Sequence, residues 1–435
     1  MNREVKDRYN IFLENLSDGL DIPPSKYQQA VERYGAVGRY LEGGQYDGSD
    51  DLPHIYVQGS FRLGTIVRPI IEGKESDYDI DLVCELQIDK QQISPGIVKT
   101  IVGKRLNEND TYKKMLDDEG RRCWTLNYAE EDGIGFHLDI LPCIPEDQNT
   151  KSTLINIGIP YDLADRSIAI TDKDGGYNYS WCTSNPNGYG DWFDQIKEPM
   201  FQLIAARKRQ AIFDSNRQIF SKVDDVPDPL IKTPLQRAIQ ILKRHRDGRF
   251  VGHSLEADKP ISMIITTLSA KLYEQQSDVL STINDIITQL YSFSNLLQSD
   301  YKNEERIANP DLITRLDNGT WYIPNPVDPG ENFADRWHEN DNRKARAFFR
   351  WINWAKNDLV EVMKIDNIRR IVSTMEERFG EQLIEKASKG VIVLGSPAII
   401  AGKTDAAPRV EINNPTKPWS NFEGRPNKIN RKSMP

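Results

Sequence analysis

One short segment limits the fold of this chain more than any other. In residues 77–83, Asp-Tyr-Asp-Ile-Asp-Leu-Val, acidic and bulky apolar side chains alternate. Successive side chains of a β-strand point to opposite faces, so Asp79 and Asp81 would share one face of a strand and the apolar residues the other. Two carboxylates on one face repel each other unless a cation lies between them, commonly a divalent ion with oxygen ligands. The segment therefore predicts a half-buried strand with a metal site on its polar face.

A second alternating segment supplies a third carboxylate. In residues 135–144, Phe136, Leu138 and Ile140 would take one face, and Asp139 would lie on the other face next to His137. If this strand pairs with the strand of Asp79 and Asp81, the three carboxylates can hold two metal ions for a phosphoryl displacement. We expect Mg²⁺, for which Mn²⁺ can substitute, and we interpret His137 as a strand neighbour and not a ligand. The simpler interpretation of isolated acids in strands is that they face solvent.

A Gly-Ser turn near these strands favours a site over the simpler interpretation. Gly59 and Ser60 follow the strand-like residues 54–58 and precede Phe-Arg-Leu-Gly-Thr. Glycine allows a phosphate to approach the backbone closely, and a serine hydroxyl with free amide groups can bind phosphate oxygens. We therefore predict that Gly59 and Ser60 bind phosphate, and the family resemblance described below extends this prediction to nucleotide binding by Gln58, Gly59 and Ser60.

The hydrophobic pattern changes along the chain. Residues 54–145 are mostly strand-like, whereas helical periodicity prevails from about residue 199. We therefore predict an α+β, two-lobed molecule with a mixed sheet and a helical lobe. Its expected parts are a helical leader that packs on the core, a catalytic lobe that carries the aspartates, a helical lobe, and an irregular basic tail, over residues 1–50, 51–198, 199–410 and 411–435.

One helix in the second half carries a candidate phosphate ligand. Residues 235–247 place Leu235, Ala238, Ile239 and Leu242 on one stripe, with Lys243 on the opposite face. We expect this lysine to be exposed, either as a solvated surface cation or as a contact to phosphate. Because arginines neighbour it in an otherwise acidic chain, we favour the phosphate contact.

Composition excludes several classes of function. The chain has 435 residues, with 56 Lys and Arg against 65 Asp and Glu, and the net charge of −9 argues against general coating of nucleic acid or of an anionic membrane. Its four cysteines form no Cys-X-X-Cys pair, no apolar run is long enough to span a bilayer, and the N-terminus has no apolar signal region. We therefore predict a cytoplasmic protein without a membrane partner.

Three motifs together resemble a known family. The segments QGSFRLGTIVRP, SDYDIDLV and HLDILPCIP are similar to those of the cGAS/DncV-like nucleotidyltransferases, bacterial members of the polymerase-β-like superfamily. The resemblance implies the two-lobed fold of that superfamily and an Mg²⁺-dependent enzyme that condenses nucleoside triphosphates into a cyclic di- or trinucleotide and releases pyrophosphate. It also implies a role in bacterial antiphage defence, with a separate downstream effector that recognises the product.

The resemblance assigns roles to residues of this chain. Asp79 and Asp81 would hold both ions, and Asp139 would complete the catalytic-ion site and help to deprotonate the attacking ribose hydroxyl. Lys243 would contact the triphosphate together with Ser60, and Ser262, in a segment that resembles the next family helix, would meet the phosphates. ATP is expected as one substrate, while the second nucleotide and the linkage stay open.

Other functions remain possible from the sequence. The same chemistry could add nucleotides to an RNA or protein acceptor, and a chain of this superfamily could bind RNA as a pseudo-enzyme, although all three acids are present here. The five histidines show no paired spacing with cysteine, so we expect neither the zinc insertion of the animal enzyme nor activation by double-stranded DNA. Tyr322 or Trp181 could stack on a base, and the basic tail is a candidate for binding a regulatory partner.

Overall fold

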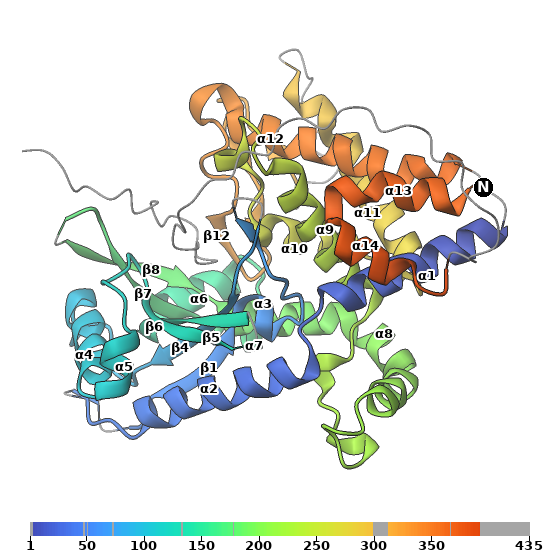
Figure 1. The fold of residues 1–435 in the computed structure, drawn as a ribbon. Coiled ribbons are helices and arrows are strands. Elements are labelled where there is room, and N and C mark those ends of the chain that lie inside the picture. The colour runs from blue at the N-terminus through green and yellow to red at the C-terminus, as the bar shows by residue number, and fades with distance from the viewer. Residues whose placement is uncertain are drawn as a thin grey trace, which may run out of the picture.

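The computed structural model describes residues 3–391, apart from 47, 50, 72–73, 132–133, 177, 299–311 and 366. The predicted tail, residues 411–435, and the last part of the predicted helical lobe lie outside the described residues. Figure 1 shows two lobes, a strand-rich lobe and a helical lobe, and this arrangement confirms the predicted α+β class. None of the described helices is both long and apolar enough to cross a bilayer.

A six-stranded mixed sheet forms the centre of the first lobe. Its order is β1-β4-β6-β7-β8, and β5 also pairs with β6. The pairing of β4 with β6 is parallel, whereas the other pairings in this sheet are antiparallel. The strands are β1 (His54–Gln58), β4 (Tyr78–Glu85), β5 (Trp124–Glu131), β6 (Ile134–Pro145), β7 (Ile168–Lys173) and β8 (Tyr179–Ser184).

The apolar faces of β4 and β6 are buried beneath helices. Tyr78, Ile80 and Leu82 on β4 share one hydrophobic core with Phe136 and Leu138 on β6, with Phe61 of the short helix after β1, and with residues of two longer helices. Those helices are α2 (Pro24–Glu42) and α4 (Pro95–Asn107), and α5 (Asp110–Met115) also packs beside the sheet. The apolar side chains of β4 share one face, as predicted, but the face that carries the aspartates is buried as well, so the prediction of a half-buried strand was wrong.

A separate core fills the helical lobe. The first helix of the chain, α1, packs there against α9, α11 and α14, while α2 packs on the sheet, so the predicted leader divides between the two lobes. The helices of this lobe are α1 (Arg3–Leu20), α9 (Pro234–Phe250), α10 (Ser262–Lys271), α11 (Val279–Ser292), α12 (Glu339–Ala355), α13 (Ile368–Phe379) and α14 (Glu381–Ser388).

Three further helices follow strands of the main sheet along the chain. In the described part of the chain, six short strands outside that sheet form three two-stranded pairs. The helices are α6 (Gln148–Asn156), α7 (Tyr161–Ala164) and α8 (Pro186–Ser215), and the four-residue α3 (Gly59–Arg62) follows β1. The short pairs are β2 (Ile70–Ile71) with β3 (Lys74–Glu75), β9 (Thr314–Arg315) with β10 (Trp321–Tyr322), and β11 (Pro324–Asn325) with β12 (Asp328–Asn332).

Helix α9 lies within the helical lobe, next to α10, α11 and α13 (Figure 1). Its residues from Pro234 to Asp247 are all buried, on every face of the helix. The helix begins with a capping box, in which the Thr233 hydroxyl accepts from the Gln236 N–H and the Gln236 side chain accepts from the Thr233 N–H. The apolar stripe predicted for this helix packs in the core of the helical lobe, and its polar face needs other partners.

Candidate active site

The parallel pairing of β4 with β6 gathers the predicted carboxylates. Asp81 lies opposite Asp139 in the register, and Asp79 lies opposite His137. All three aspartates are buried, with 2–6% of each residue exposed. The strand pairing that we made a condition for a shared site is therefore confirmed.

The Gly-Ser turn lies directly against this strand edge. Gln58 at the end of β1 pairs with Asp81, and Gly59 starts α3 with φ of +65°. A Cβ atom at residue 59 would lie 2.2 Å from Oδ2 of Asp81, far inside van der Waals contact. Both the left-handed backbone and the close approach of a carboxylate require glycine at this position.

Asp79 is held by a neighbouring histidine. Nδ1 of His137 lies 3.3 Å from Oδ1 of Asp79. The pKa of Asp79 is raised to about 6, chiefly by burial; the nearby carboxylates of Asp139 and Asp77 contribute to this rise, and His137 opposes it. A carboxylate in such surroundings gains from a bound cation.

Asp139 has a partner that the sequence did not suggest. The hydroxyl of Thr125 on β5 donates to Oδ1 of Asp139 at 2.6 Å, and both residues are buried. Thr125 lies opposite Asp139 in the antiparallel pair of β5 and β6. Antiparallel pairing of residues 124–131 with residues 134–140, had it been predicted from the sequence, would have placed Thr125 opposite Asp139.

The polar face of α9 binds the loop that follows the Gly-Ser turn. The side-chain amides of Gln236 and Gln240 donate to the carbonyl oxygens of Leu63 (2.8 Å) and Ile66 (3.0 Å). Spacing of three to four residues puts these side chains in a row along the helix, and the row continues with Lys243. Helix α9 thereby fixes the segment that leads away from Ser60.

Our expectation that Lys243 is exposed was wrong. Only 3% of this residue is exposed, and its Nζ donates to the carbonyl oxygen and the hydroxyl of Thr65, both at 3.1 Å. The pKa of Lys243 is lowered to about 7, chiefly by burial and also by the guanidinium of Arg246, while Asp247 and Asp81 oppose the shift. The physical reason for the error is that a polar helix face can be buried when backbone carbonyl groups of another segment satisfy it.

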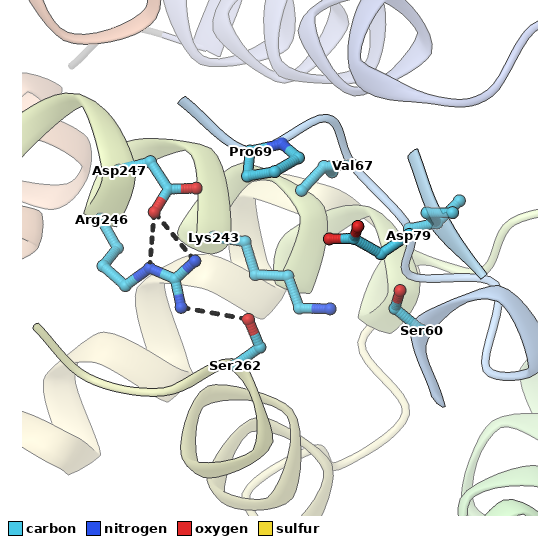
Figure 2. A pocket seen from close by; sticks show the side chains of 9 residues that line it. Ser60, Val67, Pro69, Asp79, Lys243, Arg246, Asp247 and Ser262 are labelled. Atoms are coloured by element: carbon cyan, nitrogen blue, oxygen red, sulfur yellow. Dashed lines mark hydrogen bonds and ion pairs between the residues drawn. The ribbon is translucent and has the colours of Figure 1, made fainter. Parts of the chain in front are cut away.

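A cavity of about 30 Å³ lies between the turn and α9. Four of the predicted residues line it, namely Ser60, Asp79, Lys243 and Ser262. Figure 2 shows Lys243 extending from α9 toward Asp79 and Ser60, with Arg246 beside Ser262. Gln58, Gly59, Asp81 and Asp139 are not part of its lining and lie behind it on the strand edge. Pockets for small organic ligands typically measure about 300–1,000 Å³, so a nucleotide needs a more open arrangement of these elements.

Arg246 is a further residue at this cavity. Its Nη1 donates to the hydroxyl of Ser262 at 3.1 Å and to the carbonyl oxygen of Pro260 at 2.9 Å. Its guanidinium also pairs with Asp247, which pairs in turn with Lys259. The spacing of three residues from Lys243 along a helix is the sequence signal for it.

The carboxylates fit a hard divalent cation by their chemistry. Asp79, Asp81 and Asp139 provide only oxygen donors, which Mg²⁺ and Mn²⁺ prefer, and their mutual repulsion falls when a cation binds. In the described part of the chain, no group of three His, Cys, Asp or Glu side chains is already arranged as a metal site. The backbone thus brings the ligands to one edge, where Asp79 contacts His137 and Asp139 contacts Thr125.

Comparisons with known proteins agree with this geometry. Residues 53–142, which span the turn and all three aspartates, match the model of the nucleotidyltransferase domain of DncV-like cyclic GMP-AMP synthases. A c-di-GMP synthase of Roseivirga ehrenbergii is 28% identical over 377 residues, which cover 86% of this chain and 85% of that protein. The cyclic dinucleotide synthase CdnG of Bradyrhizobium diazoefficiens is 23% identical over 433 residues, and the alignment covers 92% of this chain and 92% of that protein.

A solved structure shows the same fold. The structure of Bradyrhizobium diazoefficiens CdnG in complex with GTP has a TM-score of 0.61 to this one, with 19% identity over 88% of this chain and 98% of that chain. Together with the domain match, this likeness defines an enzyme of the nucleotidyltransferase class with the polymerase-β-like fold. Within that class, the chain is similar to the DncV-like nucleotidyltransferases over residues 53–142 and to two curated synthases of cyclic dinucleotides over most of its length.

Proposed function

We propose that this enzyme condenses nucleoside triphosphates into a cyclic di- or trinucleotide and releases pyrophosphate, with Mg²⁺ as its metal. The observation that carries the proposal is the register of β4 and β6, in which Asp81 lies opposite Asp139 beside the Gly59 turn. The curated relatives at 28% and 23% identity, a c-di-GMP synthase and a cyclic dinucleotide synthase, support this product class.

In the proposed reaction, a ribose hydroxyl oxygen of one nucleotide attacks the α-phosphorus of another. A phosphodiester bond forms, the bond to the bridging oxygen of the β-phosphate breaks, and pyrophosphate leaves; a second, intramolecular round closes the ring. Asp139 helps to remove the proton of the attacking hydroxyl. Two divalent ions, held by Asp79, Asp81 and Asp139, would supply charge neutralisation for the attacking and leaving oxygens.

The other end of the site would bind the triphosphate. Ser60 contributes its hydroxyl, and Lys243, Arg246 and Ser262 lie around the same cavity. Lys243 must exchange its contacts with Thr65 for phosphate oxygens, which stabilise the charged ammonium that burial disfavours. Gln58 would lie beside the bound nucleotide through its position next to Gly59.

We propose purine triphosphates as substrates. ATP was expected in at least one position, but the relative named as a c-di-GMP synthase and the GTP-bound structure of CdnG make GTP equally important to test. Neither proposed stacking residue lines the described cavity: the hydroxyl of Tyr322 donates to the carbonyl oxygen of Pro329, and Trp181 packs beside the sheet core. Their role in base binding stays a prediction.

The biological setting is also a proposal. By likeness to its family, the product would act in the cytoplasm on a separate effector in antiphage defence. A regulatory partner for the tail remains an expectation from the sequence. We do not expect double-stranded DNA to activate the enzyme.

Incubation with labelled nucleotides tests the proposed reaction. The full chain is incubated with each of the four labelled triphosphates, alone and in pairs, with Mg²⁺ or Mn²⁺, and the products are treated with phosphatase and identified by mass spectrometry. Small phosphatase-resistant products made by the wild type and not by Asp81→Asn support the proposal. Products that lengthen an added RNA or label a protein would replace it with transfer to an acceptor, and pyrimidine-only products would overturn the purine assignment.

A further inference from the structure

His137 lies between two carboxylates at the strand edge. Its Nδ1 is 3.3 Å from Oδ1 of Asp79, and its Nε2 is 3.6 Å from Oδ2 of Asp77. All three side chains are largely buried, with 15%, 7% and 18% of the His137, Asp79 and Asp77 side chains exposed. Each ring nitrogen thus faces a different acid, and only one of these acids, Asp79, lines the cavity.

Asp77 is itself fixed to the beginning of β6. Its Oδ1 accepts from the backbone N–H of Gly135 at 2.8 Å. A Cβ atom at residue 135 would lie 2.5 Å from Oδ2 of Asp77, so the close approach of this carboxylate depends on glycine. Asp77 is therefore anchored on the same strand that carries His137 and Asp139.

We propose that Asp77 and His137 are positioning residues that hold the carboxylate of Asp79 in the orientation that binds the metal ion. This inference rests on the proposed function, because it needs Asp79 to be a ligand. The imidazole fixes one oxygen of Asp79, and the carboxylate lines the cavity. Carboxylates that bind metals are commonly fixed by such outer partners, and an ion then binds without having to reorient its ligand.

The same geometry argues against His137 as a ligand. A metal-binding imidazole needs one ring nitrogen turned to the ion, while both ring nitrogens of His137 face carboxylates within the protein. His137 was interpreted from the sequence as a strand neighbour of the acids. Its position between Asp77 and Asp79 allows His137 to orient the carboxylate of Asp79.

Direct measurement of Mn²⁺ binding to the full chain tests the inference without an activity assay. Titrations followed by electron paramagnetic resonance compare wild type, His137→Leu and His137→Asn. Loss of an outer partner commonly weakens metal binding about 10- to 100-fold, and we expect a loss in this range for His137→Leu. The amide nitrogen of asparagine can replace Nδ1 as a donor to Asp79, so His137→Asn is expected to recover most of the binding.

Three further variants make the test decisive. His54→Leu replaces an exposed histidine at the far end of β1, opposite Glu85, and should bind Mn²⁺ like wild type. Asp77→Asn keeps an acceptor for the Gly135 N–H but removes the charge beside His137, so it should weaken Mn²⁺ binding even if His137→Leu does not fold. Asp81→Asn should abolish binding by the proposed metal site.

The outcomes separate the two proposals. Wild-type Mn²⁺ affinity in Asp81→Asn would overturn the proposed metal site itself. Loss of binding in Asp81→Asn, with wild-type affinity in Asp77→Asn and in folded His137→Leu, would overturn the positioning role alone. Equal loss in His137→Leu and His137→Asn would also contradict it, because the conservative variant must rescue a residue that acts as a donor to Asp79.

Discussion

Two regions border the same cavity, the paired edge of β4 and β6 and the polar face of α9. They differ in the charge and in the hydrogen bonding of their side chains. The strand edge gathers three buried carboxylates, and the pKa of Asp79 is raised to about 6. The helix face presents amide and ammonium donors, and each of Gln236, Gln240 and Lys243 has a carbonyl acceptor in residues 63–66. The strand edge gathers like charges, with His137 and Lys243 as nearby basic groups, while the helix face is satisfied by hydrogen bonds within the protein.

This difference shows how the two sides would respond to substrate. A cation relieves the strand edge, so metal binding there is favoured by the repulsion already present. A triphosphate at the helix face must compete with Thr65 for Lys243, although it also stabilises the charge of a lysine whose pKa burial lowers to about 7. We therefore expect large effects from changes at the strand edge and smaller, pH-dependent effects from changes at the helix face.

The largest effect is expected for the double variant Asp79→Asn with Asp81→Asn. Product formation should fall by about 10³-fold or more, because amides cannot hold the ions. The melting temperature without metal should not fall, since the amides remove buried like charges and keep the shape. Product assays and thermal melting check both. The control Glu85→Gln, at the other end of β4, should keep activity, and turnover by the double variant at the wild-type rate would contradict the assignment.

A smaller effect, on folding as well as activity, is expected for Gly59→Ala. The substitution places a Cβ atom 2.2 Å from Asp81 in a backbone with φ of +65°. Gly252 has nearly the same φ, +67°, with open space around the added atom, so Gly252→Ala isolates the backbone cost of about 1–2 kcal/mol. Chemical denaturation should show a larger loss of stability for Gly59→Ala, and product assays should show lost activity for that variant alone. Equal losses of stability would mean that the contact with Asp81 is not tight.

The strand edge was predictable from the sequence because strand periodicity is exact. Asp139 is the one acid in its alternating segment, so pairing with the other strand could bring it only to the face of Asp79 and Asp81. The burial of Lys243 was not predictable, because one of its acceptors is the backbone carbonyl group of Thr65. A hydrophobic pattern describes side chains only and cannot show which carbonyl group accepts a hydrogen bond. The contacts of His137 and Thr125 likewise depend on which strands pair and in which register.

A moderate effect on nucleotide binding is expected for Lys243→Met. The loss of a charge-assisted contact should weaken binding of a triphosphate by about 10- to 100-fold. Because the pKa of Lys243 is about 7, raising the pH from 6 to 9 should weaken wild-type binding relative to the variant, whose side chain cannot titrate. Calorimetric titration with a non-hydrolysable triphosphate measures both, with the exposed Lys222→Met as control. Equal affinities of wild type and Lys243→Met at pH 6 would make Lys243 a structural residue of the 63–66 loop.

The smallest effect is expected in the pH dependence of folding. In the unfolded chain Lys243 keeps its proton up to about pH 10.5, whereas in the folded chain its pKa is about 7. Between these pH values the unfolded chain binds more protons, so the free energy of unfolding should rise with pH; below about pH 7 both forms are protonated and the contribution is flat. From pH 7.5 to 8.5, the wild type should gain about 1 kcal/mol relative to Lys243→Met. Urea denaturation of both proteins across this range measures the difference. If the free energy of unfolding changes with pH in the same way in both proteins, Lys243 is charged in the folded chain. The helix face then depends on a counter-charge as much as the strand edge does.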